Sequence, residues 1–265
     1  MPSDRDTGFD LDRLVAETFV AQVQFHETID STNTAALAAS EQEDLQLPLL
    51  VLAGEQTAGR GRGSNTWWSA TGSLTFSLLL NPSNLGLEQR DWPRVSLTTG
   101  LATCLALDEF LAAESSCSLK WPNDVLLHDR KISGILVEAG VGAAGNLVIG
   151  IGINVNNSFQ DAPDPLPTTA TSLIDSTQQE FSLDAVLVQV LQQLQRQLDR
   201  LANHDPALPA DWQQRSALNG RTLEVVTEKR SYRGTCQGID EHGALTLKTE
   251  DGLEQLFSGQ VQSIE

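Results

Sequence analysis

Basic residues are scarce in this chain. Among its 265 residues, 17 are lysine or arginine and 35 are aspartate or glutamate, which gives a formal net charge of −18 and an isoelectric point of about 4.4. Nucleic-acid binding requires a basic surface that displaces counterions from phosphates. The charge therefore argues against a nucleic acid as partner.

Cysteines and long apolar runs are also few. Cys104, Cys117 and Cys236 are odd in number, far apart and without metal-ligand spacing, which fits a reducing compartment and no structural zinc. No apolar run approaches the ~18 residues of a membrane span, and the polar residues 1–10 do not resemble a signal peptide. We therefore expect a cytoplasmic protein that does not bind membranes.

The residues that are present predict a mixed architecture. An apolar fraction of 40% suffices for a large core, and the length suits one large domain with a small satellite. Apolar or alternating runs predict strands at 23–25, 49–55, 74–80, 118–121, 125–127, 131–139 and 147–155. Helical patterns follow residues 30–34, cover residues 93–113 and begin again at residue 183. Short β-rich runs at 222–227, 231–237, 244–249 and 253–258 predict a small β-barrel.

One glycine-rich loop, residues 56–69 (hereafter the Gly/Arg loop), holds the only two basic residues between 14 and 89, Arg60 and Arg62. Glycine lets backbone N–H groups approach an anion closely, and arginine adds planar, permanently charged donors. The loop therefore predicts anion binding, although a flexible solvated loop fits the same residues. Trp67 and Trp68 follow, offering a face for a planar ring or packing into the core.

A second cluster contains two of the four lysines. Lys120 and Lys131 bracket a turn that holds Asn123 and Asp124. Lys131 opens an apolar strand, where a charge requires an anionic or carboxylate partner. The alternative is a surface hairpin with ordinary salt bridges. The glycines of the strand at 147–155 predict close approach of another backbone or of a ligand.

Several segments also occur in the order and spacing of one family: Asp30-Ser31-Thr32-Asn33, Gln56-Thr57-Ala58-Gly59-Arg60-Gly61-Arg62, Trp67, Lys120-Trp121-Pro122-Asn123-Asp124, residues 129–138 (DRKISGILVE) and residues 150–156 (GIGINVN). Together they resemble biotin protein ligase over about residues 23–157. The terminal β module is similar to the SH3-like domain of that family.

The resemblance implies an α+β fold, with a mixed or antiparallel sheet and packed helices as in class II synthetases, plus a C-terminal SH3-like β-barrel. The domains implied are an N-terminal extension (1–22), a catalytic domain (23–217) and the SH3-like domain (218–265). The activity implied has two steps: biotin and ATP form biotinyl-5'-AMP and pyrophosphate, and a specific lysine of a biotin carboxyl carrier domain, of acetyl-CoA carboxylase or a related carboxylase, then takes the biotin. Magnesium is expected with the ATP, and a homodimer is possible.

By the same resemblance, the catalytic residues are Arg62, Lys131 and Asp124, with Asp124 facing Mg²⁺ or the incoming lysine. The residues implied for biotin are Ser31, Thr32, Asn33, Gln56, Gly59, Arg60 and Lys131. Those implied for the nucleotide are Arg62, Trp67, Asn123, Lys131 and Asn154. The chain departs from the family pattern at Gly63-Ser64-Asn65-Thr66, and Gln237 stands where some relatives carry arginine.

Three other functions are compatible with parts of this pattern. A lipoate ligase or octanoyl transferase shares the catalytic fold but is disfavoured by residues 120–124 and the terminal β module. A non-catalytic biotin-binding protein is disfavoured because both Arg62 and Lys131 are present. Some relatives repress transcription through an N-terminal helix-turn-helix, and the twenty or so residues before the first strand, together with the negative charge, predict no such activity here.

Overall fold

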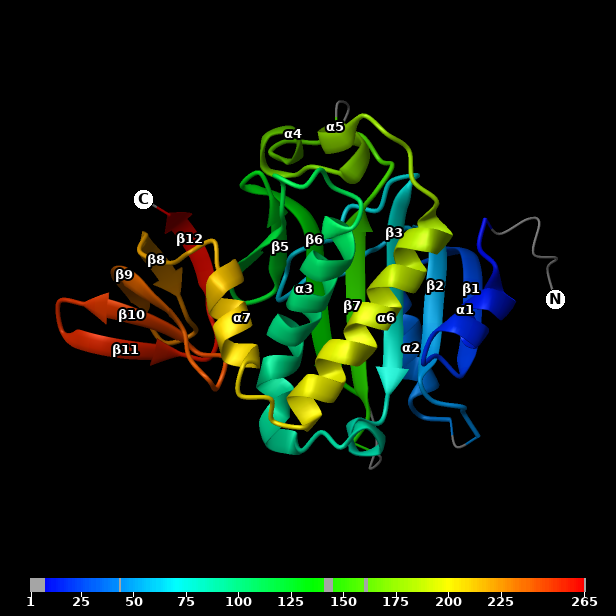
Figure 1. Cartoon of the computed structure of the whole chain (residues 1–265), viewed down its shortest axis with the longest axis horizontal. Coiled ribbons are helices and arrows are strands. Elements are labelled where there is room, and N and C mark those ends of the chain that lie inside the picture. The colour runs from blue at the N-terminus through cyan, green and yellow to red at the C-terminus, as the bar shows by residue number, and fades with distance from the viewer. Residues whose placement is uncertain (1–7, 43, 141–144, 160–161, 265) are drawn as a thin grey trace.

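A computed structural model describes residues 8–42, 44–140, 145–159 and 162–264. Figure 1 shows a central sheet, helices packed along it and a smaller β unit at one end. The helices are α1 (Leu11–Glu17), α2 (Thr32–Ala39), α3 (Trp92–Asp108), α4 (Leu166–Thr169), α5 (Leu173–Thr177), α6 (Leu183–Ala202) and α7 (Leu208–Arg215), with 3-10 turns η1 (Pro82–Leu85) and η2 (Gln89–Asp91).

The central sheet has seven strands in the order β1-β2-β3-β7-β6-β5-β4. Only β1 and β2 pair in parallel, and every other neighbouring pair is antiparallel. The fold is therefore α+β with a mixed sheet, as expected. The strands are β1 (Gln22–Ile29), β2 (Leu49–Gln56), β3 (Ser73–Leu80), β4 (Ser118–Lys120), β5 (Asp124–Leu127), β6 (Arg130–Ala139) and β7 (Leu147–Asn154).

The two faces of the sheet pack against different helices, because alternate side chains of each strand point to opposite faces. The α2 face holds a small buried cluster of Ala36, Ala39, Leu49, Val51, Leu79 and Val148. The opposite face carries the main core, over which α3 and α6 lie side by side (Figure 1). The buried leucines of α6 recur at helical spacing (Leu187, Leu191, Leu194, Leu198), and truncating one to alanine costs about 2–5 kcal/mol.

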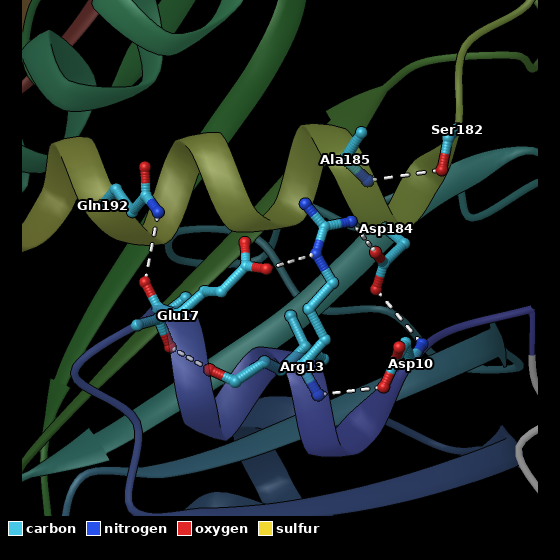
Figure 2. A network of polar contacts seen from close by, with 9 residues as sticks. Asp10, Arg13, Glu17, Ser182, Asp184, Ala185 and Gln192 are labelled. Carbon is cyan, nitrogen blue, oxygen red and sulfur yellow. Dashed lines mark hydrogen bonds and ion pairs between the residues drawn. The ribbon is translucent and has the colours of Figure 1, made fainter.

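The N-terminal helix is held against α6 by a polar network (Figure 2). Asp184 on α6 accepts hydrogen bonds from the backbone N of Asp10 (3.2 Å) and from Nη1 of Arg13 (2.8 Å). Farther along, Gln192 donates to the backbone oxygen of Glu17 (3.1 Å). Because Leu14 is also fully buried, the described part of the N-terminal extension is packed into the molecule, while its boundary at residue 22 stays a prediction.

The smaller unit is a five-stranded antiparallel sheet in the order β11-β10-β9-β8-β12. Its strands are β8 (Thr222–Val226), β9 (Ser231–Ile239), β10 (Leu245–Thr249), β11 (Gly252–Leu256) and β12 (Gln260–Ile264). Its buried residues are continuous with the main core, and the buried Trp121 donates its indole N–H to the backbone oxygen of Gly243 (3.1 Å). We refer to this unit as the barrel.

Three details differ from the sequence-based expectation. The helix predicted at 93–113 ends at Asp108. Strand β12 was not predicted, and neither was the parallel pairing of β1 with β2. Among the described residues, no helix combines the length and apolar character needed to cross a bilayer.

Candidate active site

A cleft of about 800 Å³ lies between the central sheet, the Gly/Arg loop and the barrel. The sheet contributes residues of β3, β6 and β7, and the barrel contributes residues 226–228 and 258–261. The predicted site residues that line the cleft are Ser31, Thr32, Asn33, Gln56, Arg60, Arg62, Trp67, Asn123, Asp124 and Lys131. One cavity therefore brings together segments that are up to 230 residues apart in sequence, from Ser31 to Val261.

Glycines form the floor of the cleft. A Cβ added to Gly150 would overlap Oδ1 of Asn33, and one added to Gly152 would overlap the ring of Trp67. Both glycines are on β7 and share a face, because they are two residues apart. The sequence predicted close approach of another backbone or of a ligand at these glycines, whereas the groups that approach are the side chains of Asn33 and Trp67.

Neutral polar groups gather at one end of the cleft. The backbone N and the hydroxyl of Thr32 donate to Oε1 of Gln56, at 2.8 and 3.1 Å. Ser77 on β3, which the sequence analysis did not select, lies 2.8 Å from the hydroxyl of Thr32. Ser31, Thr32 and Ser77 are all buried. Hydroxyls and an amide in a buried corner suit hydrogen bonding to an uncharged polar ring.

Of the cations that line the cleft, three have a partner: Arg60, Arg62 and Lys131. Arg60 makes a two-pronged ion pair with Glu138, with Nη2–Oε1 at 2.7 Å and Nη1–Oε2 at 3.1 Å. Arg62 donates to the backbone oxygen of Gly259 in the barrel (2.6 Å). Both arginines come from the Gly/Arg loop, so this loop carries positive charge to the edge of the cleft.

The third cation, Lys131, stands at the start of β6. Its Nζ lies 2.6 Å from Oδ1 of Asp124 and 5.9 Å from the centroid of the Trp67 ring. The carboxylate partner predicted for a lysine at this strand position is therefore Asp124. Lys120 also lines the cleft, although the sequence analysis gave it no role.

The turn that precedes β5 is fixed to β6. The side-chain amide of Asn123 donates to the backbone oxygen of Ile135 (2.8 Å), and the backbone oxygen of Asn123 accepts from the backbone N of Ile135 (2.9 Å). This double contact holds Asn123 and Asp124 at the cleft wall.

Two predicted site residues do not line the cleft. Asn154 is buried, and its side chain reaches the backbone oxygen of Lys131 (3.4 Å) and the side chain of Asn157 (3.2 Å). Gly59 is buried too, and its backbone oxygen accepts from the backbone N of Trp67 (2.9 Å). Asn154 thus contacts the start of β6, which carries Lys131, and Gly59 helps to close the Gly/Arg loop, which carries Arg60 and Arg62.

Trp67 and Trp68 are both half-buried, so neither packs wholly into the core. The ring of Trp68 packs on Phe159, with centroids 5.5 Å apart. Gln237 is exposed on β9 and does not line the cleft.

The carboxylates and cysteines limit the metal binding and the thiol chemistry that the protein can support. Among the described residues, no cluster of three or more metal-ligating side chains exists, and the carboxylates that line the cleft are Asp124 and Glu228. One or two carboxylates suit Mg²⁺ that is bound mainly by nucleotide phosphates, not a metal held by protein alone. The cysteines are free and buried, and burial raises the pKa of the Cys104 thiol, which does not suit a nucleophile.

Comparison with known proteins gives a consistent result. Residues 25–154 match the Biotin/lipoate A/B protein ligase family, and residues 220–262 match the Biotin protein ligase C terminal domain. The chain is 33% identical over 242 residues to the biotin--[acetyl-CoA-carboxylase] ligase of Paracoccus denitrificans, which covers 88% of this chain and 96% of that protein. It is 29% identical to the bifunctional ligase/repressor BirA of Bacillus subtilis (strain 168), over 94% of this chain and 76% of that protein.

A solved structure agrees with these relatives. The biotin protein ligase from Aquifex aeolicus in complex with biotin and ATP is 30% identical to this chain. It superposes with a TM-score of 0.78 over 92% of this chain and 99% of that chain.

Proposed function

This chain belongs to the biotin protein ligase family, and we propose that it activates biotin with ATP and transfers the biotin to one lysine of a biotin carboxyl carrier domain. The observation that supports this most directly is the meeting of Arg60, Arg62 and Lys131 with a neutral polar corner in one cleft. Biotin has an uncharged ring and a carboxylate tail, and the proposed reaction joins this tail to a nucleotide phosphate. Its neutral and charged groups therefore follow the same order as those that line the cleft.

In the first step, a carboxylate oxygen of biotin attacks the α-phosphorus of ATP. A new P–O bond forms, the bond to the β-phosphate breaks, and pyrophosphate leaves. Negative charge accumulates on phosphate oxygens, so we assign Lys131 and Arg62 to its stabilisation. Their present partners, Asp124 and the Gly259 carbonyl, keep both cations at the cleft edge until an anion arrives.

The second step requires that the mixed anhydride survives until a carrier arrives. We propose that the Gly/Arg loop shields it from water, since the loop lines the cleft and its residues 62–66 are exposed. The lysine amine of the carrier then attacks the acyl carbon, the acyl–phosphate bond breaks, and AMP leaves. We assign to Asp124, which lines the cleft, the task of accepting or orienting the amine proton.

Magnesium is proposed as the companion of ATP. Asp124 is the carboxylate that would hold it, together with the nucleotide phosphates, and the ion would neutralise phosphate charge.

We further propose that the protein acts in the cytoplasm, which its free cysteines support, and that it does not bind DNA. The Bacillus subtilis relative is a bifunctional ligase/repressor, but a chain with a net charge of −18 offers little basic surface. Duplex DNA should therefore not be retarded in a gel at moderate salt. A tight shift would contradict this part of the proposal.

The deciding experiment follows pyrophosphate release and transfer to a purified carrier domain. With biotin, ATP and Mg²⁺, we expect stoichiometric biotinyl-AMP and labelling of one carrier lysine. Lipoate and octanoate serve as matched acids, and release with either of them but not with biotin would support the alternative ligases of the same fold.

A further inference from the structure

Gln213 on α7 makes a contact with the barrel that neither the sequence motifs nor the proposed reaction explains. Its side-chain amide accepts a hydrogen bond from the backbone N of Ile239 (2.8 Å) and donates one to the backbone oxygen of Gln237 (3.3 Å). Both partners belong to β9. Because a glutamine amide carries a donor and an acceptor, as a peptide group does, Gln213 pairs with β9 as a residue of a neighbouring strand would.

The backbone of β9 needs such a partner because its pairing with neighbouring strands is interrupted there. Adjacent residues of β10 pair with Gly238 and Cys236, so Gln237 is the extra residue of a bulge. On its other side β9 has passed the end of β8, whose first residue pairs with Thr235. Backbone groups left without a partner inside a protein are costly. The amide of Gln213 therefore completes this part of the barrel.

The contact between α7 and β9 is also tight. Gly238 has a φ of +127°, in a region that side chains with a Cβ rarely adopt, and a Cβ added there would overlap the side-chain amide of Gln213. The backbone of β9 can therefore approach α7 this closely because position 238 is glycine.

The same helix is fixed to the central sheet. Just after α7, the backbone N of Ala217 donates to the backbone oxygen of Leu119 on β4 (2.8 Å), and β4 leads directly into the turn before β5. Within α7, Arg215 forms an ion pair with Asp108 at the end of α3. One short helix thus links β9 of the barrel to the strand that precedes the cleft wall.

The barrel lies at the end of the cleft where Lys131 stands. Strands β6 and β5 lie toward the barrel side of the sheet, whereas the polar corner is formed by α2, β2 and β3 on the other side (Figure 1). Residues 226–228 and 258–261 of the barrel line the cleft. Because we assign Lys131 to the phosphate, this barrel wall belongs to the nucleotide end.

We propose that Gln213 is a positioning residue: by completing the β9 backbone at its bulge, it holds the barrel against the central sheet and so places residues 226–228 and 258–261 at the nucleotide end of the cleft. Gln213 does not itself line the cleft, so it acts through the barrel. The indole of Trp121, which bonds to Gly243, is a second tie between the same two parts and can report on the first.

The first test needs no ligand. Because the indole N–H of Trp121 is buried and bonded to the barrel, its rate of hydrogen exchange, followed by NMR, reports how often the barrel separates from the sheet. Gln213→Leu removes both hydrogen bonds to β9, and we expect it to raise that rate about 10-fold, because two backbone groups lose their partner. The rate is divided by that of the backbone N–H of Ile151 in the central sheet, so that global unfolding cancels.

Two further variants make the comparison specific. Gln192→Leu on α6 removes an amide contact of the same kind, to the backbone oxygen of Glu17, and should leave the ratio unchanged. Gln213→Glu keeps an acceptor for Ile239 but loses the donor for Gln237, and should give an intermediate ratio. An unchanged ratio in Gln213→Leu, or an equal rise in Gln192→Leu, would overturn the proposal.

The role in the reaction, which rests on the proposed function, is tested by steady-state kinetics. Gln213→Leu should raise KM for ATP about 5-fold and leave KM for biotin nearly unchanged, because the barrel wall lies at the nucleotide end. Equal rises in both KM values would contradict this positioning role. A wild-type protein that forms no biotinyl-AMP, with the exchange ratio changed as expected, would reject the proposed function and leave the attachment of the barrel by Gln213 standing.

Discussion

Strand β7 is buried along its whole length, whereas residues 62–66 of the Gly/Arg loop are all exposed, and the two form opposite sides of one cleft. The floor is shaped by backbone and by the absence of side chains at Gly150 and Gly152. The loop is shaped by its own hydrogen bonds and by two arginine contacts. A site of this kind combines a rigid surface that selects a ligand with a loosely held one that can open for it.

This difference predicts that changes on the floor cost more than changes in the loop. The largest effect is expected for Lys131→Ala, at the edge of the floor, because it removes the cation that we assign to the reacting phosphate. Formation of biotinyl-AMP should fall by about 10²–10³-fold, the usual loss for one electrostatic stabiliser. Single-turnover kinetics measure it, with Lys248→Ala, an exposed lysine of the barrel, as the matched control. A loss below about threefold would mean that Lys131 does not face the reacting phosphate.

A second variant tests the floor by shape alone. Gly152→Ala adds a methyl group that overlaps the Trp67 ring, and we expect about 1–3 kcal/mol of destabilisation in urea unfolding, as for other overpacked sites. In a Trp67→Ala background the same methyl group should cost much less. If the cost is the same in both backgrounds, the ring does not lie on Gly152.

A smaller effect is expected in the loop. Arg62→Ala removes one contact to the barrel carbonyl, so bound biotinyl-AMP should dissociate about 5- to 10-fold faster, which corresponds to the net contribution of one ordinary hydrogen bond, about 1 kcal/mol. Its rate of formation should change less than in Lys131→Ala. A chase experiment with excess unlabelled biotin measures dissociation, and Arg230→Ala provides the control. A loop variant as damaging as Lys131→Ala would remove the distinction between floor and loop.

The smallest effect concerns the cysteines. Burial raises the pKa of both Cys104 and Cys117 above the usual thiol value, so these thiols stay protonated in the folded protein at neutral pH. Alkylation should be slow until denaturant is added. In the unfolded chain a thiol titrates near pH ~8.5, so the stability from the two buried thiols is complete below that pH and declines as pH rises above it. Rapid alkylation of the native protein at pH 7 would contradict their burial.

The positions of many strands and helices could be predicted from the sequence, but the contacts between these elements largely could not. Alternation in residues 74–80 predicted a strand, and β3 spans Ser73–Leu80. The same residues gave no sign that Ser77 bonds to Thr32 and Asn33 behind the cleft, because every residue of β3 is buried and hydrophobic neighbours surround the serine in sequence. Parallel pairing of β1 with β2 also depends on contacts between distant segments, which periodicity does not record.

The candidate site shows the same division. Rare cations among glycines pointed to Arg60 and Arg62, and a lysine that opens an apolar strand pointed to Lys131. The anionic or carboxylate partner expected for Lys131 is Asp124. Glu138 was part of a recognised segment, yet its partner lies 78 positions away, so nothing local indicated the pair. The contact of Arg62 with Gly259 depends on how the barrel packs, which the sequence of either part does not show.

The indole of Trp121 joins the central sheet to the barrel. Trp121 belongs to the turn that places Asn123 and Asp124, and its N–H is satisfied by Gly243 of the barrel. Cutting the chain before the barrel would strand that donor in an apolar interior and loosen the turn beside it. An engineered form shortened by removal of the barrel should therefore lose activity. A barrel taken from another protein would have to supply a carbonyl oxygen at the same position to accept the Trp121 N–H.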